Sequence, residues 1–130
     1  MAARFSLSRV LQIDALSCIA CALPMLAASQ PLAALTGLGA DFLWSAGAVL
    51  TGFTLLFGWL GILRTAPPML VLFAIAGNIG WIVASFAVLL VFAEALTPAG
   101  SALIVAQAFV TGLLALGEAS GLRTQQALHA

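Results

Sequence analysis

A long run without a charged side chain, positions 69–93, limits what this chain can fold into more than any other feature of the sequence. An α-helix needs about 20 mostly apolar residues to cross the hydrocarbon core of a bilayer, and this run exceeds that length. Asn78 and Trp81 lie near its middle. Because an amide and an indole N–H at that depth meet no water, we expect both to face other helices and to find partners there.

The composition of the whole chain indicates a membrane protein. Hydrophobic residues make up 64% of it and charged residues only 6%, whereas about a quarter of residues are charged in soluble domains. The 130 residues have room for four spans, which we expect at positions 10–29, 42–63, 69–93 and 99–122, with the apolar connector 30–41 lying along the membrane surface as a short helix. The sequence therefore predicts an all-α fold in one domain (1–130), a four-helix antiparallel transmembrane bundle.

The charged residues predict how the bundle is oriented. Cytoplasmic loops of membrane proteins carry an excess of Lys and Arg. The arginines all fall at the N-terminus, the second turn and the C-terminus: Arg4, Arg9, Arg64 and Arg123. The opposite side carries Asp41 and Glu94. We therefore expect both termini in the cytoplasm (N-in/C-in), and the Ala-, Leu- and Gly-rich composition with Arg in place of Lys suits a bacterial inner membrane.

Two acids, Asp14 and Glu118, are predicted inside the spans. Asp14 lies five residues inward of Arg9 and Glu118 five inward of Arg123, so each sits roughly 7 Å below its arginine. Because they share a depth, they can face each other and share a proton if the first and last spans are neighbours. The alternative, which the sequence favours, is that each acid reaches the cytoplasmic interface or pairs with an arginine.

Polar residues at mid-depth form a second candidate group. Asn78, Trp81 and Ser85 form a stripe on the third span, and Gln107, Thr111 and Glu118 share one face of the fourth. Such groups either form interhelical hydrogen bonds, worth about 0.6 to 2 kcal/mol each, or line a path for a substrate or ion. We favour hydrogen bonds, because Trp81 fills much of any lumen in so small a bundle. A cavity of useful size would weaken that preference.

Cys18 and Cys21 have the C-x-x-C spacing of redox-active dithiols. A pair inside the membrane, without a second pair to exchange electrons, is poorly placed for that chemistry, so we expect small core residues. The histidine His129 is in the C-terminal tail. The sequence has no set of metal ligands, phosphate-binding loop or hydrolase triad, so we expect no metal, no cofactor and no enzymatic activity.

Small residues recur at helical spacing in the second, third and fourth spans, where they let helix backbones approach closely. The candidates for such packing are Gly47, Gly52, Gly80, Ala84, Gly117 and Gly121. Several stripes on one span offer more packing surface than a lone bundle needs. The surplus predicts contacts with other membrane subunits or with a second copy of the chain.

Several short motifs follow one another along nearly the whole chain. They are Arg9 to Asp14-Ala15-Leu16, Pro31 to Leu38, Asn78-x-x-Trp81, and Gln107 and Glu118 followed by Gly121-Leu122-Arg123. In this order they resemble a group of short uncharacterised bacterial four-helix integral membrane proteins. The resemblance implies a four-span topology and no established activity.

These features favour a non-catalytic accessory or structural subunit of a larger bacterial inner-membrane complex. The alternative is a small homodimeric proton-coupled transporter or channel that uses the intramembrane acids, and a membrane thiol or quinone redox protein is the third candidate. A net charge of zero, without a basic run, excludes nucleic acid as a partner. Outward-facing glycines and alanines would favour the subunit. A polar cavity lined by both acids would favour the transporter, and a disulfide bond between Cys18 and Cys21 would favour the redox protein.

Overall fold

The computed structural model describes residues 6–128, and all of its regular structure is helical. The helices are α1 (Leu7–Ala27), α2 (Ser29–Thr36), α3 (Ala40–Ile62), α4 (Pro68–Val91) and α5 (Pro98–Leu128). Helices α1, α3, α4 and α5 are each long and apolar enough to cross a membrane. The all-α fold and the four candidate spans expected from the sequence are therefore confirmed.

The last helix is longer than the sequence predicts. It continues past position 122 to Leu128. In these extra turns the Gln125 side chain bonds both backbone groups of Ala66 in the α3–α4 turn, accepting from its N–H at 3.2 Å and donating to its carbonyl at 2.9 Å. This pair of tertiary hydrogen bonds holds the polar end of α5 in helical form, which the hydropathy pattern does not reveal.

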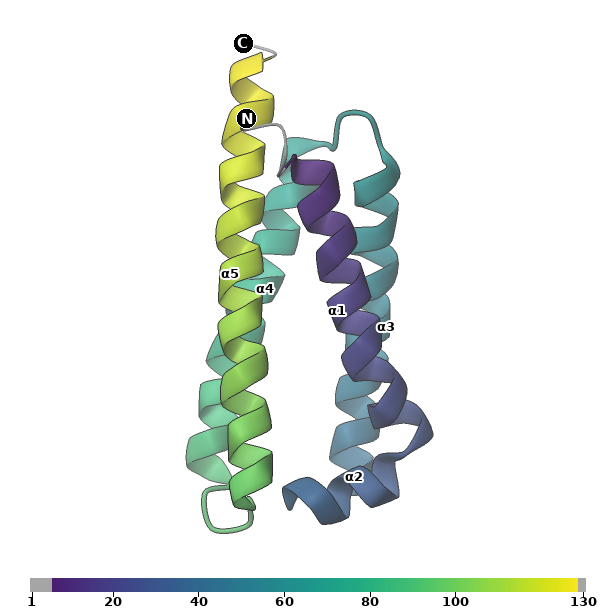
Figure 1. Ribbon diagram of the computed structural model, residues 1–130, viewed down its shortest axis with the longest axis vertical. Helices are drawn as coiled ribbons and strands as arrows, with labels where there is room; N and C mark the ends of the chain where they lie inside the picture. The colour runs from purple at the N-terminus through teal and green to yellow at the C-terminus, as the bar shows by residue number, and fades with distance from the viewer. Residues whose placement is uncertain (1–5, 129–130) are drawn as a thin grey trace.

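The four long helices form two pairs. Helix α1 packs along α3 and α4 along α5, and the pairs meet chiefly where α1 contacts α5. Consecutive long helices run in opposite directions (Figure 1), so the start of α1, the α3–α4 turn and the end of α5 lie together. We call this the terminal end, and the opposite end, where α2 lies beside the α4–α5 turn, the α2 end.

The tightest packing lies toward the terminal end. Leu11, Leu60 and Val71 have no exposed surface there, and Phe57 keeps only 1%. Toward the α2 end the two pairs diverge (Figure 1). The bundle is therefore closed at one end and spread at the other, and this asymmetry makes room for the cavity described below.

Glycines allow the closest helix approaches. A Cβ atom at Gly121 would lie 2.9 Å from the Leu7 Cα, and one at Gly117 would lie 3.1 Å from a methyl group of Val10, so both glycines bring α5 against α1. Gly47 does the same between α3 and α1, where a Cβ would lie 3.0 Å from that of Met25. Two of the other small residues proposed for packing, Gly52 and Gly80, face open space, because a Cβ there meets nothing within 4 Å. The third, Ala84, is exposed in the wall of the cavity described below.

Helix α2 ties the two pairs together at its end of the bundle. It ends at Thr36 and is capped by Gly37, whose φ of 87° lies in the left-handed region that favours glycine. A Cβ at Gly37 would lie only 2.1 Å from the Ala95 carbonyl oxygen of the α4–α5 turn. Thr97 adds two hydrogen bonds, from its N–H to the Thr36 carbonyl at 3.0 Å and from its hydroxyl to the Leu35 carbonyl at 2.5 Å. The short connector helix thus joins α1 and α3 to the start of α5.

Replacing Gly121 by Ala should weaken the contact between α1 and α5. The added methyl group would collide with the Leu7 backbone, so we expect a loss of about 1–3 kcal/mol of unfolding free energy, measured by SDS titration in mild detergent and followed by circular dichroism. Gly80→Ala is the matched control, because its methyl group meets open space, and it should cause no loss. Equal stability of the two variants would contradict the close approach.

Candidate functional site

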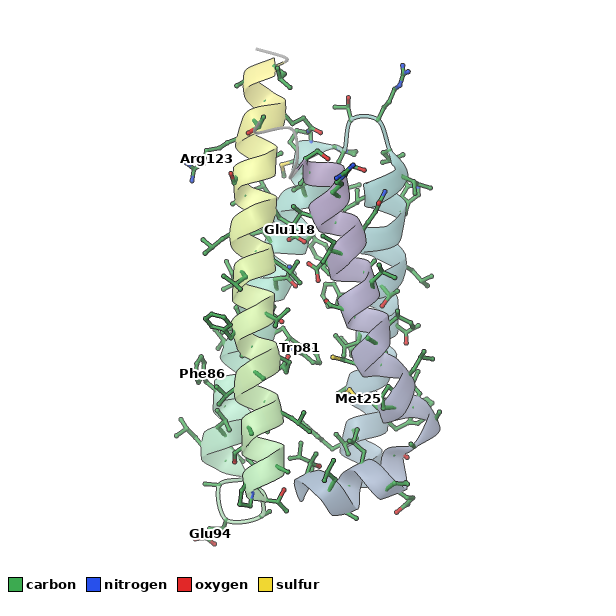
Figure 2. All side chains as sticks on the ribbon, viewed as in Figure 1. Met25, Trp81, Phe86, Glu94, Glu118 and Arg123 are labelled. Atoms are coloured by element: carbon green, nitrogen blue, oxygen red, sulfur yellow. The ribbon has the colours of Figure 1, made fainter. Side chains whose placement is uncertain are left out.

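The two intramembrane acids meet inside the bundle, on either side of Asn78. The Asn78 Nδ2 atom donates to Asp14 Oδ2 at 2.7 Å and to Glu118 Oε1 at 2.9 Å. All three side chains are buried, with exposed fractions of 2% for Asp14, 5% for Asn78 and 0% for Glu118. We call these three residues the acid cluster. Figure 2 shows Glu118 on the side of α5 that faces α1.

The acid cluster spans the contact between the two helix pairs. Asp14 comes from α1, whereas Asn78 and Glu118 come from α4 and α5. Gly117 precedes Glu118, and Gly121 lies one turn further on the same helix, so the close approach of α5 to α1 brings the two carboxyl groups together. On α4, Asn78 lies on the buried face with Val71, Ala74 and Ser85.

Most polar atoms of the cluster have a partner, and one does not. The Cys18 thiol donates to Asp14 Oδ1 at 3.6 Å. Glu118 Oε2 is buried without a hydrogen-bond partner, although Glu118 and Asp14 accept from the same Asn78 amide nitrogen and so lie close together. Two ionised carboxylates can only accept, but a proton on one makes it a donor to the other. The geometry therefore suits a pair of acids that shares one proton.

This arrangement differs from the one that the sequence favours for the acids. The arginines in the described part of the chain, Arg9, Arg64 and Arg123, are exposed, and Figure 2 shows Arg123 pointing away from the bundle. Asp14 and Glu118 are bonded to Asn78 instead. A shallow acid ordinarily reaches the interface or a nearby cation, whereas here the close approach of two helices buries both acids against an amide.

A second polar group lies further toward the α2 end. The Trp81 indole N–H donates to Gln107 Oε1 at 2.7 Å, and Gln107 Nε2 donates to the Ser85 hydroxyl at 2.9 Å. Ser85 in turn donates to the Trp81 carbonyl at 2.7 Å, and Thr111 donates to the Gln107 carbonyl at the same distance. Trp81 and Gln107 thus find the interhelical partners that an indole and an amide need in the membrane.

A cavity lies between the two helix pairs. The part next to the acid cluster, the acid-side chamber, has a volume of about 270 Å³. Its polar wall is formed by Asp14, Ser17, Cys18, Asn78, Gln107 and Thr111. Glu118 does not line either chamber, so only one of the two acids borders the cavity. The second part, the α2-side chamber, has a volume of about 550 Å³ and a mostly apolar wall.

Both chambers are lined by Cys21, Leu50, Trp81, Leu103 and Gln107. Trp81 therefore borders the cavity without filling it. The reason for expecting the polar residues to form interhelical hydrogen bonds rather than to line a path for a substrate or ion no longer applies.

Two aromatic residues of the acid-side chamber were not singled out in the sequence. Phe53 and Phe57, both on α3, line it together with Trp81. No sequence signal separates them from Phe73 and Phe86, which are 58% and 56% exposed on the outer face of α4. The packing of α3 and α4 against their neighbours decides which phenylalanines face the cavity.

The described residues contain neither a disulfide bond between Cys18 and Cys21 nor a metal site. Cys18 and Cys21 are both free, Cys18 buried against Asp14 and Cys21 in the cavity wall. Residues 6–128 contain no group of three or more His, Cys, Asp or Glu placed to hold a metal ion. His129 lies outside the described residues.

Comparison with known family models, with curated proteins and with solved structures finds no match to this chain. The four apolar helices implied by the resemblance to short bacterial membrane proteins are present. What the site does has to be inferred from its own geometry.

Asn78 should stabilise the bundle more strongly when both acids are present than when one is replaced. We expect Asn78→Leu to cost about 2–4 kcal/mol of unfolding free energy, because two buried carboxyl groups lose their donor. The loss should be smaller by about 1 kcal/mol or more when Glu118 is already Gln, whose amide can donate to Asp14. SDS titration of the double-mutant cycle measures this difference. Thr51→Val, which removes a hydroxyl bonded within its own helix, serves as the control, and additive losses would contradict the shared cluster.

Proposed function

We propose that the protein is a small proton-coupled carrier of an apolar or amphipathic solute. The observation that supports this most directly is the acid cluster itself, in which two buried carboxyl groups share one amide donor beside a cavity. Ionisable groups inside a membrane are costly and by default indicate a functional site.

The position of the acid cluster supports coupling between a proton and the helix arrangement. Because Asp14 lies on one helix pair and Glu118 on the other, the charge state of the two acids changes the attraction between the pairs. One shared proton favours close contact, whereas two ionised carboxylates repel each other in an apolar surrounding. Proton release therefore favours separation of the pairs, and a solute that binds the separated form becomes linked to the proton.

The described helix ends support an orientation for this carrier. Arg9, Arg64 and Arg123 are exposed at the terminal end, and Asp41 and Glu94 are exposed at the α2 end. By the excess of positive charge on the cytoplasmic side, the terminal end faces the cytoplasm and the α2 end faces the outer side of a bacterial inner membrane. The cavity then extends from the outer side toward the acid cluster.

The accessory subunit is the second candidate function. Gly52 and Gly80 face outward and let another transmembrane helix approach closely. They equally suit a second copy of the chain, as a homodimeric carrier requires. A stoichiometric partner protein in native mass spectrometry after mild extraction would favour the subunit.

The orientation can be tested with single cysteines. In a chain carrying Cys18→Ala and Cys21→Ala, a membrane-impermeant thiol reagent added to intact cells should label Glu94→Cys and leave Thr65→Cys unlabelled, because only the α2 end faces outward. Opening the cells should expose Thr65→Cys to the reagent. The reverse pattern would overturn the orientation.

Carrier function can be tested by proton flux into proteoliposomes that contain a pH-sensitive dye. Three benzene derivatives of different charge, benzyltrimethylammonium, benzenesulfonate and benzyl alcohol, serve as solutes. At least one should drive a proton flux above that of protein-free liposomes. We expect Asp14→Asn and Glu118→Gln each to reduce that flux to the protein-free level, and Asp41→Asn to leave it unchanged. Absence of flux with every solute would count against the carrier.

A further inference from the structure

The acid-side chamber brings a carboxyl group and aromatic rings to one space between the helix pairs. Asp14 lines it from α1, and Phe53, Phe57 and Trp81 line it from α3 and α4. Aromatic faces attract organic cations, and the attraction is strongest at sites shielded from water. A carboxylate supplies the opposite charge at the same place. Negative charge with aromatic walls is complementary to a cation that carries apolar groups.

The charges around the chamber favour the same ligand. The acids bond to the Asn78 amide and the Cys18 thiol, while Arg9, Arg64 and Arg123 are exposed at the terminal end. The positive charge that balances the acid pair is therefore the proton that Asp14 and Glu118 share. Glu118 Oε2, which is buried without a partner, adds a polar atom whose pairing depends on that proton.

The α2-side chamber gives such a ligand room for its apolar part. It continues from the acid-side chamber past Trp81 and Leu50, and Phe42, Met25 and Val88 contribute to its largely apolar wall. The combined space thus has one acidic end and one apolar end. Its shape and chemistry fit a molecule with a single positive charge and a bulky hydrocarbon body.

We propose that the cavity binds a lipophilic organic cation, with its positive charge against Asp14 and its apolar body between Trp81 and Phe53. The bound cation replaces the proton that Asp14 and Glu118 share, so one positive charge enters the site and one proton leaves to solvent. This inference rests on the proposed carrier function and names its substrate class. In transport terms, the cation and the proton move in exchange.

The groups around Asp14 come from all four long helices, and the thiols of Cys18 and Cys21 on its own helix are titratable groups besides Glu118. Cys18 lies on its own helix, Glu118 faces it from α5, and Asn78 from α4 is neutral. From α3, the apolar residues Leu50, Phe53 and Phe57 line the same chamber. The acid pair is therefore the group for which a proton and a cation compete. Cation binding should weaken as the pH falls.

Equilibrium binding tests the charge requirement. Tetraphenylphosphonium is the cationic probe, and tetraphenylborate has the same shape with a negative charge. Isothermal titration of the purified full chain in lipid nanodiscs should show binding of the phosphonium alone. Titration in two buffers of different ionisation enthalpy should show release of about one proton for each cation bound, since the pair holds one. Equal binding of both probes would overturn the proposal.

Two variants separate a cation site from a structural role. Asp14→Asn keeps a polar side chain of the same size, and it should weaken phosphonium binding by about thirtyfold or more. Glu118→Gln leaves Asp14 without a partner acid, so binding should remain while proton release disappears. Circular dichroism confirms the fold of each variant, and Asp41→Asn on the exposed start of α3 should behave like the unmodified chain. Unchanged binding in Asp14→Asn would overturn the proposal.

The binding experiment tests the cation site and the flux experiment tests the carrier, so either proposal can be rejected without the other. Phosphonium binding without proton flux in liposomes would retain the cation site and reject the carrier. Flux driven only by benzenesulfonate or benzyl alcohol, without phosphonium binding, would retain the carrier and reject the cation.

Discussion

The bundle depends on one constraint, the burial of Asp14 and Glu118 at the contact between its two helix pairs. A charged group in a low-dielectric interior is tolerated only when it is paired or hydrogen-bonded. Here the Asn78 amide supplies hydrogen bonds to both acids. The close approach of α5 to α1 at Gly117 and Gly121 makes this arrangement possible, because any larger side chain at Gly121 would meet the Leu7 backbone.

The cavity follows from the same asymmetry. Leu11, Leu60 and Val71 close the bundle at the terminal end, while helix α2 and Thr97 hold the separated pairs together at the other end. Between these two attachments, space remains beside the acid cluster. Trp81 is held at the border of that space by its hydrogen bond to Gln107. The same bond that satisfies the indole therefore also keeps its ring at the cavity wall.

The two candidate functions, a proton-coupled carrier and an accessory subunit, are supported by different parts of the bundle. The carrier interpretation draws on the interior, where acids, amides and aromatic rings meet. The subunit interpretation draws on the exterior, where Gly52 and Gly80 face outward. We favour the carrier because the interior arrangement combines costly groups at a defined geometry, whereas small residues on a lipid-facing helix cost little. The two are compatible if copies of the chain associate through their outer faces.

The sequence by itself determined that the chain is helical, that four helices are apolar enough to span a membrane, and that Asp14, Asn78, Trp81, Gln107 and Glu118 lie within them. Helix length and hydrophobicity are local properties, so they can be predicted without knowing which helices touch. Only the tertiary structure decided that Asp14 and Glu118 share Asn78, that Phe53 faces a cavity while Phe73 faces outward, and that Gln125 extends the last helix. These outcomes depend on which helices are neighbours and on how closely they approach. The spacing of residues along one helix predicts neither of these.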